Sequence, residues 1–236
     1  MLFDALLVAK KDLRIEWRSK VTSSQIAPFA VLILVLFAFA LDNVVASDPG
    51  DSRALSPDSV AASTVTAGLF WLAVFFAALL AIQRSFSIET ADGANDSLRM
   101  SALDPAGIFL GKAAAVAVQL LILEALLGGF SVLFFPAHIT NPLLLVVTCL
   151  LATVGLVTVG TCHGALSAGL RSRDTLLPLL YFPIVTPVLL GAVKATQDAL
   201  SSEVGEGWIW VRLLTVFAVI YTAVGILIFG SLLEEA

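Results

Sequence analysis

Residues 160–190 read GTCHGALSAGLRSRDTLLPLLYFPIVTPVLL, two apolar runs that are separated by the polar turn Arg171-Ser172-Arg173-Asp174. Long apolar runs joined by a short basic turn are typical of two membrane helices that share a cytoplasmic loop. The whole chain agrees, because 59% of its residues are hydrophobic, 13% are charged and its mean hydropathy is +0.99. Soluble domains carry about 25% charged residues. The sequence therefore predicts a membrane protein.

Six apolar stretches are long enough to cross a hydrocarbon core about 30 Å thick. Their connections are short, and the chain shows neither an internal repeat nor a nucleotide-binding loop of the GxxxxGK[ST] kind. We therefore expect an all-α polytopic membrane protein with one domain over residues 1–236, and any ATP would be bound by another chain. The expected spans are residues 25–42, 61–82, 107–135, 142–170, 175–193 and 209–232.

The Lys and Arg residues fall unevenly on the two sides of these spans. Only Arg53, Lys194 and Arg212 lie on one side, and the other ten of the 13 lie on the opposite side. The positive-inside rule then places both termini in the cytoplasm and the chain in the cytoplasmic (inner) membrane. Arg171 and Arg173 become anchors of a cytoplasmic turn. The ten are Lys10, Lys11, Arg14, Arg18, Lys20, Arg84, Arg99, Lys112, Arg171 and Arg173.

Residues 2–20 have the pattern of an amphipathic helix. Apolar side chains recur at helical spacing, and cations occupy the other faces. Such a helix is expected to lie in the inner membrane interface, with Trp17 at the level of the lipid headgroups. A first span that simply extends into the cytoplasm is the alternative. The apolar stripe comprises Leu2, Leu6, Ala9, Leu13 and Trp17.

The connection at residues 84–106 is the longest on the cytoplasmic side. It is polar but contains several apolar side chains, among them Leu98 and Met100, and Pro105 ends any helix that precedes it. A permease that is driven by a separate ATPase needs a short inner helix of this kind, which fits a groove on the ATPase. The alternative is a loop that packs only against its own helices.

Two stretches resemble known families. The pattern of residues 89–112 resembles that of a small ABC-2-type permease, and the stretch ALSAGLRSRDTLLPLLYFPIVTPVLL at 165–190 is similar to the haem exporter protein B family of cytochrome c maturation. The segment Lys11–Arg18, KDLRIEWR, is also similar to the opening helix of that family. The residues that carry the first pattern are Glu89, Asp92, Gly93, Asp96, Leu98, Ser101, Pro105, Gly111 and Lys112.

This resemblance implies an ABC-2-type architecture and a non-catalytic permease subunit of a complex for cytochrome c biogenesis. The implied partners are a cytoplasmic ATPase with two nucleotide sites that bind ATP and Mg²⁺ and further membrane subunits that handle haem. The sequence leaves open whether the chain pairs with a second copy of itself or with a different membrane subunit. In that family, ATP hydrolysis accompanies release of a haem-loaded chaperone, and passage of haem through the permease is an open question. Neither a nucleic acid partner nor a metal site is expected.

Two other functional classes are alternatives to this one. A generic ABC-2-type exporter of a lipid, glycan or drug would share the segment at 84–106 and is the main alternative. A proton- or ion-coupled secondary transporter is disfavoured, because Glu124 is the one ionisable residue expected deep in the bilayer and no paired charge accompanies it.

Some polar residues inside the spans are candidates for a pathway. Glu124 lies near the middle of its span, where an ionisable group is costly and is often functional, and Gln119 could join it in one polar spot. A carboxyl group that merely links helices by a hydrogen bond is the alternative. His163 and His138 could ligate haem iron, but packing and loop roles are more common.

Small residues and prolines mark the two helices around the quoted turn. Gly160 and Gly164 form a GxxxG pair, which lets membrane helices approach closely. Pro178, Pro183 and Pro187 each remove a backbone hydrogen bond and would permit bending. A stiff helix beside a bendable one would suit a mechanical coupler, although glycine and proline are common in membrane helices anyway.

The two cysteines are not expected to form a disulfide. Cys149 and Cys162 lie on one expected helix, about 20 Å apart at 1.5 Å per residue, which is too far for a disulfide bridge. They are expected to act as small apolar side chains, with a contact to a ligand as the alternative.

Overall fold

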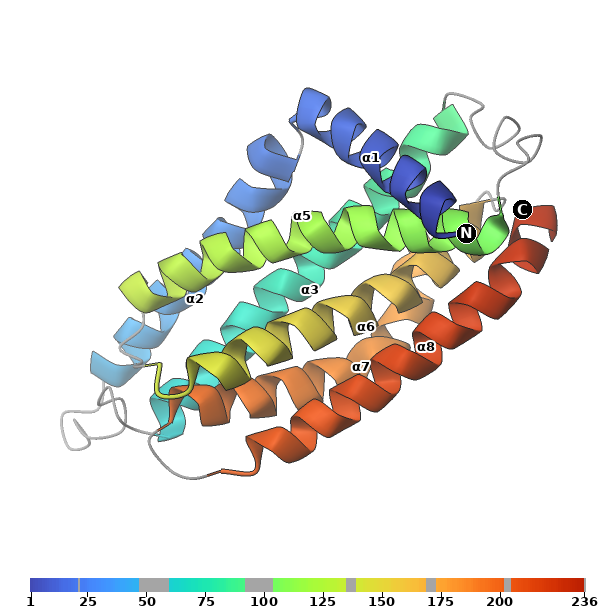
Figure 1. Ribbon diagram of the computed structural model, residues 1–236. Helices are drawn as coiled ribbons and strands as arrows, with labels where there is room; N and C mark the ends of the chain where they lie inside the picture. Colours follow the sequence, from blue (N-terminus) through green and yellow to red (C-terminus); the bar gives the residue numbers. More distant parts are fainter. Residues whose placement is uncertain are drawn as a thin grey trace.

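The computed structural model describes residues 1–20, 22–46, 60–91, 104–134, 139–168, 173–201 and 205–235. Within these ranges every regular element is a helix (Figure 1). The elements are α1 (Leu2–Ser19), the short π-helix η1 (Thr22–Ile26), α2 (Ala27–Ala46), α3 (Val60–Ala91), α5 (Pro105–Phe134), α6 (Pro142–Ala168), α7 (Arg173–Leu200) and α8 (Gly207–Glu235).

Five of these helices are long and apolar enough to cross a membrane: α3, α5, α6, α7 and α8. A sixth span exists if Leu2–Ser19 and Ser24–Phe39, which are bent by 54° relative to each other, cross together as one broken span. An all-helical membrane protein is thus confirmed. The sidedness of the chain and the interfacial character of α1 stay predictions.

The break after α1 has a local cause. Lys20 adopts the left-handed conformation, with φ of 54°, and its N–H donates a 2.9 Å hydrogen bond to the Glu16 carbonyl. This geometry caps the last turn and turns the chain away from the helix axis. The segment expected to span the membrane at 25–42 therefore starts from a corner that follows α1.

The helices α3 and α6 form the centre of the bundle. In their candidate spans 61% and 56% of the residues are buried, against 22% in α8, which lies at the edge (Figure 1). Trp71 and Tyr181 are fully buried but keep their polar atoms bonded: Trp71 Nε1 donates to Thr196 Oγ1 at 2.9 Å, and the Tyr181 hydroxyl donates to the Leu156 carbonyl at 3.1 Å. These bonds tie α3 to α7 and α7 to α6.

The glycine pair of α6 receives side chains from α3. A Cβ atom on Gly160 would collide with Ile82, and one on Gly164 would collide with Phe86. Ile82 and Phe86 lie one turn apart on α3 and are both buried. The two helices thus pack closely because Ile82 and Phe86 of α3 fill the space beside Gly160 and Gly164 of α6.

The three prolines lie inside one continuous helix, α7. Pro183 and Pro187 are on its exposed side, and Pro178 is half-buried. The helix runs from Arg173 to Leu200, so it extends beyond the expected span at 175–193. Bending at these prolines stays a prediction.

Candidate functional site

Helix α1 packs closely against the first turns of α5. Gly107 and Gly111 lie one turn apart on α5, and neither leaves room for a side chain. A Cβ atom on Gly107 would lie 2.9 Å from the Met1 carbonyl oxygen, and one on Gly111 would lie 2.6 Å from the Ala5 carbonyl oxygen. This GxxxG pair lets the backbones of the two helices approach, as small residues do in membrane helix pairs.

Opposite charges meet beside this contact. Lys112 Nζ lies 4.0 Å from Asp12 Oδ2 on α1 and 4.5 Å from the centroid of the Phe86 ring on α3. Arg84 Nε on α3 lies 3.5 Å from Glu16 Oε2 on α1. The Lys112 side chain is only 3% exposed. Asp12 of α1 is thus paired with Lys112 of α5, and Glu16 of α1 is paired with Arg84 of α3.

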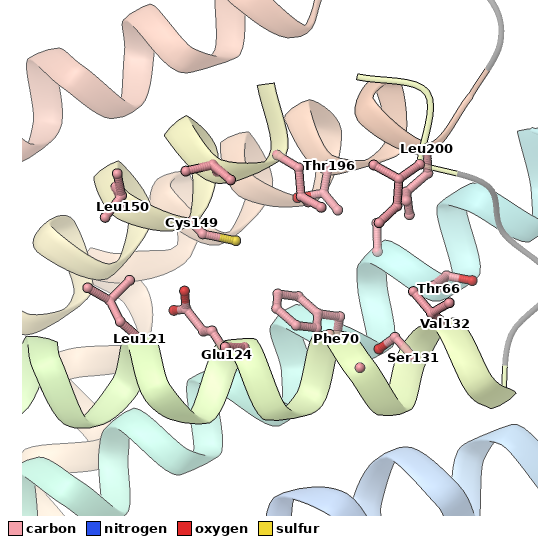
Figure 2. Close-up of a pocket in the computed structure, with 17 residues that line it drawn as sticks. Thr66, Phe70, Leu121, Glu124, Ser131, Val132, Cys149, Leu150, Thr196 and Leu200 are labelled. Atoms are coloured by element: carbon pink, nitrogen blue, oxygen red, sulfur yellow. The ribbon is translucent and has the colours of Figure 1, made fainter. Parts of the chain in front are cut away.

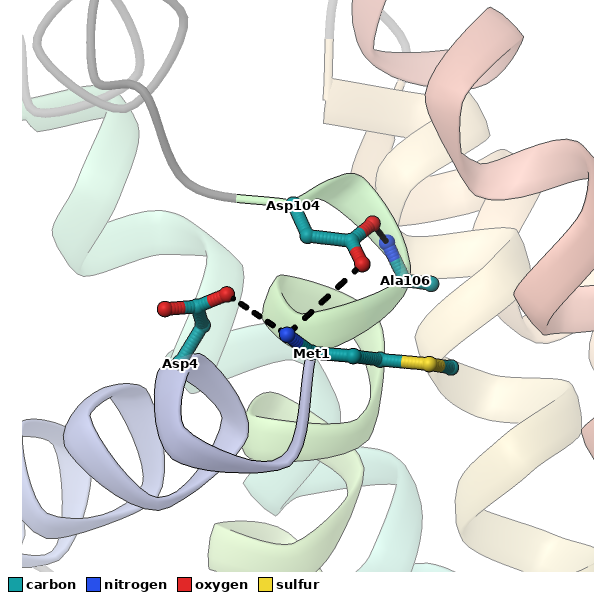
Figure 3. Close-up of polar contacts among 4 residues, drawn as sticks. All are labelled: Met1, Asp4, Asp104 and Ala106. Atoms are coloured by element: carbon teal, nitrogen blue, oxygen red, sulfur yellow. Dashed lines mark hydrogen bonds and ion pairs between the residues drawn. The ribbon is translucent and has the colours of Figure 1, made fainter.

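The first residue of the chain extends this polar contact (Figure 3). The Met1 ammonium donates a 2.9 Å hydrogen bond to Asp4 and lies 3.8 Å from Asp104 Oδ2. The hydrogen bond with Asp4 raises the pKa of the Met1 ammonium. Asp104 Oδ1 also accepts a hydrogen bond from the Ala106 N–H at 3.1 Å. Asp104 therefore caps α5 just before Pro105, which occupies the first helical position, where proline is well tolerated.

Several apolar side chains of α1 are left uncovered by the described part of the chain. Leu2, Leu6 and Trp17 are 81%, 66% and 78% exposed. Ala9 and Leu13, from the same predicted stripe, are half-buried. The helix therefore turns Asp12 and Glu16 toward the bundle and much of its apolar stripe away from it.

Most residues of the predicted ATPase-contact segment lie outside the described residues. These are Asp92, Gly93, Asp96, Leu98 and Met100, and Arg171 of the basic turn also falls outside. Glu89 is in the last turn of α3, and Arg173 is the first residue of α7. Because α3 continues to Ala91, the segment predicted at 84–106 begins inside a helix rather than in a loop.

A pocket of about 620 Å³ lies far from α1, between α3, α5, α6 and α7 (Figure 2). Its walls come from the start of α3, the last turns of α5, the start of α6 and the end of α7. Thr140 fixes the end of α7 beside the pocket, since its hydroxyl shares its one proton between the Ser201 carbonyl at 2.6 Å and the Ala199 carbonyl at 2.9 Å. The polar lining residues are Thr66, Glu124, Ser131, Cys149 and Thr196.

Glu124 is the ionisable carboxyl of this pocket. The residue is 4% exposed, and its Oε1 accepts a 2.5 Å hydrogen bond from the Thr153 hydroxyl of α6. No described group forms a hydrogen bond with Oε2. Figure 2 shows the carboxyl group directed from α5 into the pocket, toward Cys149 on α6. The carboxyl thus has one satisfied oxygen and one that is available to a further group.

The other predicted pathway residues are not gathered around Glu124. Gln119 is half-buried and does not line the pocket. His163 is half-buried near the end of α6, and its Nδ1 lies 2.8 Å from the Val159 carbonyl, so Nδ1 is the protonated nitrogen. His138 lies outside the described residues. Cys149 and Cys162 are both free thiols, and Cys149 lines the pocket.

Sequence reasoning missed the paired charges on α1 and the partners of Glu124. The acids at positions 4, 12 and 16 recur at multiples of four residues, which places them on one helical face and could have indicated a buried polar stripe. The pair Gly107 and Gly111 was an equally visible signal. No local signal joins Glu124 to Thr153, because these residues are far apart in the chain.

Comparison with known proteins gives a consistent assignment. Residues 3–234 match the family described as CcmB protein. The heme exporter protein B of Haemophilus influenzae is 27% identical over 82% of this chain and 81% of its own length. The proteins of that name from Rhodobacter capsulatus and Pseudomonas aeruginosa are 33% and 32% identical, over 64% and 72% of this chain and 70% and 76% of their own lengths. The resemblance seen in the sequence is confirmed, and the chain belongs to the CcmB family.

Proposed function

We propose that this chain is the permease subunit of an ATP-driven heme exporter that serves cytochrome c maturation. The match to the CcmB family over residues 3–234, together with relatives named heme exporter protein B, carries this proposal. The helical membrane architecture is consistent with it. The chain is a non-catalytic membrane component, and ATP and Mg²⁺ belong to a partner ATPase.

The ATPase is proposed to bind the segment at 84–106. In support, α3 ends at Ala91 and α5 begins at Pro105 at the end of the bundle where both termini lie (Figure 1). The chain between these helices must leave and return at that end. The apolar residues Leu98 and Met100 would then insert into a groove on the ATPase, as amphipathic helices do.

This end of the bundle is proposed to face the cytoplasm. The two termini lie near each other there (Figure 1), and Arg84 and Lys112 lie near it. A cytoplasmic excess of cations is the rule for membrane proteins. The exposed side chains of Leu2, Leu6 and Trp17 support an interfacial position for α1, with these groups inserted at the lipid headgroup boundary.

The haem-binding groups are proposed to lie on other membrane subunits of the complex. The chain offers only sparse tryptophans near its last span, Trp208 and Trp210. The chain is therefore proposed to supply energy-coupled motion, either beside a second copy of itself or beside a different membrane subunit.

Covalently bound haem in cell membranes tests the proposed function. A strain that lacks this chain is expected to lose all haem-stained c-type cytochromes, and restoring the chain is expected to return them. Non-covalent haem proteins in the same membranes serve as the control and are expected to stay unchanged. Normal c-type cytochromes in the deletion strain would overturn the proposal and favour export of a lipid, glycan or drug.

Co-purification of the ATPase tests the proposed contact segment. The double substitution Leu98→Asp and Met100→Asp is expected to detach the ATPase while the chain still inserts into the membrane. Asn95→Asp adds a charge in the same segment without removing an apolar side chain and is expected to retain the ATPase. Unchanged co-purification of the double variant would remove Leu98 and Met100 from the contact.

A further inference from the structure

The pocket contains polar atoms that the described part of the chain leaves without hydrogen bonds. Glu124 Oε2 and Ser131 Oγ are both buried and unpartnered within that part, and both residues line the pocket from α5. No lysine or arginine is among the described lining residues. Burying a carboxylate without a counter-charge is costly, so a buried acid is stable as the neutral form or beside a cation.

The pocket opens sideways between α5 and α6. On α5 the lining residues Gly129 and Val132 are exposed, and on α6 so are Val146 and Leu150. All four lie within spans that are long and apolar enough to cross a membrane. In a bilayer this exposed rim would face hydrocarbon, and a molecule dissolved in the bilayer could enter without crossing water.

Two consecutive glycines of α5 that line the pocket, Gly128 and Gly129, have open space beside them. A Cβ atom on Gly128 or Gly129 would meet no heavy atom within 4 Å. Glycines that pack against a neighbour behave differently, as Gly111 does beside α1. The cavity volume of about 620 Å³ lies within the range of small-molecule sites, about 300–1,000 Å³.

We propose that this pocket binds a single-chain amphiphile with an amine head, in which the ammonium pairs with Glu124 and the alkyl chain fills the apolar walls. An ammonium supplies the cation that the described lining lacks, and its N–H groups can donate to Glu124 Oε2. A carboxylate or phosphate head supplies no cation, so Glu124 would have to stay in its neutral form beside it and no ion pair would form. The propionates of haem fall in this excluded class, so this site does not rest on the proposed function.

Photo-crosslinking with three matched probes tests this site. The chain is placed in phosphatidylcholine nanodiscs with octadecylamine, octadecanol or octadecanoate, each with a photoreactive diazirine in its alkyl chain. Labelled peptides of α5 and α6 are then quantified by mass spectrometry. Octadecylamine is expected to label the pocket at least tenfold more than octadecanoate, with octadecanol in between.

Two variants separate the volume of the pocket from its charge. Gly128→Leu fills the open space beside this glycine and is expected to lower labelling by octadecylamine at least tenfold, whereas Gly68→Leu is the matched control. Gly68 is also a half-buried helical glycine with no heavy atom within 4 Å of an added Cβ, but it does not line the pocket. Glu124→Gln keeps the size of the side chain and is expected to remove the preference for the amine over the alcohol.

Several results would overturn the proposal. Equal labelling by all three probes would mean that the pocket does not select an amine. Labelling that survives Gly128→Leu would place the probe elsewhere on the helices, and an amine preference that survives Glu124→Gln would take the carboxyl out of recognition. Each result is read on the purified chain, so it is independent of cytochrome maturation in cells.

Discussion

Two acids, Asp12 beside α5 and Glu124 on it, differ in how the chain surrounds them. Asp12 on α1 is 13% exposed at its side chain and lies 4.0 Å from the Lys112 ammonium and 3.1 Å from that of Lys11. Glu124 is 4% exposed and has a hydroxyl donor, Thr153, but no cation among the described lining residues of its pocket. Asp12 is paired with lysines of the same chain and therefore serves the fold. Glu124 has no such partner and is available to bind a ligand.

Glycines on α5 repeat the same contrast. At one end Gly107 and Gly111 are covered by the backbone of α1, and at the other end Gly128 and Gly129 face open space. One helix thus offers a closed contact near its start and an open cavity near its end. The closed contact is expected to be sensitive to substitution, and the open one is expected to be tolerant.

The largest effect on stability is expected for Lys112→Met. Asp12 and the Phe86 ring would lose a cation that is almost fully buried, and removing one partner of such a pair costs about 3 kcal/mol. Thermal unfolding in detergent would measure the loss. The double variant Asp12→Asn with Lys112→Met is expected to recover at least half of the lost stability. An unchanged unfolding midpoint in Lys112→Met would contradict the contrast between Asp12 and Glu124.

A smaller loss, about 2 kcal/mol, is expected for Gly111→Ala. The new methyl group would lie 2.6 Å from the Ala5 carbonyl oxygen, so α1 must shift away from α5. The same unfolding assay applies, and the fluorescence of Trp17, on the exposed face of α1, would report the shift. Gly129→Ala is the control and is expected to leave the midpoint unchanged or raise it, since nothing lies within 4 Å. Equal behaviour of the two variants would contradict the difference between the ends of α5.

For Arg84→Gln we expect a loss of only about 0.5–1 kcal/mol. Its Nε lies 3.5 Å from Glu16 Oε2, and the arginine side chain is 30% exposed, so water and headgroups screen the pair. Unfolding midpoints at low and high salt would measure the effect, which should shrink with added salt. A loss as large as that of Lys112→Met would show that both ion pairs act as one buried unit.

No loss is expected for Glu124→Leu. The substitution removes a buried carboxyl that lacks a described cation and lets an apolar side chain fill its place, which is neutral or stabilising in such sites. The unfolding midpoint should stay the same or rise. A drop comparable to that of Lys112→Met would show that Glu124 serves the fold through Thr153, and the contrast between the two acids would fail.

The sequence predicted helices better than it predicted their contacts. In a bilayer every backbone polar group must be bonded within the segment, so apolar length alone identifies α3, α5, α6, α7 and α8. Helix ends were less clear, because no glycine or proline marks the last turns of α3 before Gly93. Arg84 could not be assigned to a helical contact for that reason.

Side-chain partners depend on tertiary geometry, which local patterns do not contain. Glu124 was identified because an ionisable residue in an apolar run is unusual. Gln119 was paired with it by proximity, yet five residues separate the two by about 140° around a helix. The apolar stripe of α1 was found by periodicity, but its acids were missed as bundle contacts, since charged faces of amphipathic helices usually meet water.

Helix α5 joins the two regions as one stiff rod. Its 30 residues run from Pro105 to Phe134 with no proline after the first position, unlike α7, which has three inside. At 1.5 Å per residue the rod is about 45 Å long, so a tilt of about 5° at one end moves the other by about 4 Å. A movement of this size would let a force applied near α1 change the width of the pocket opening between α5 and α6.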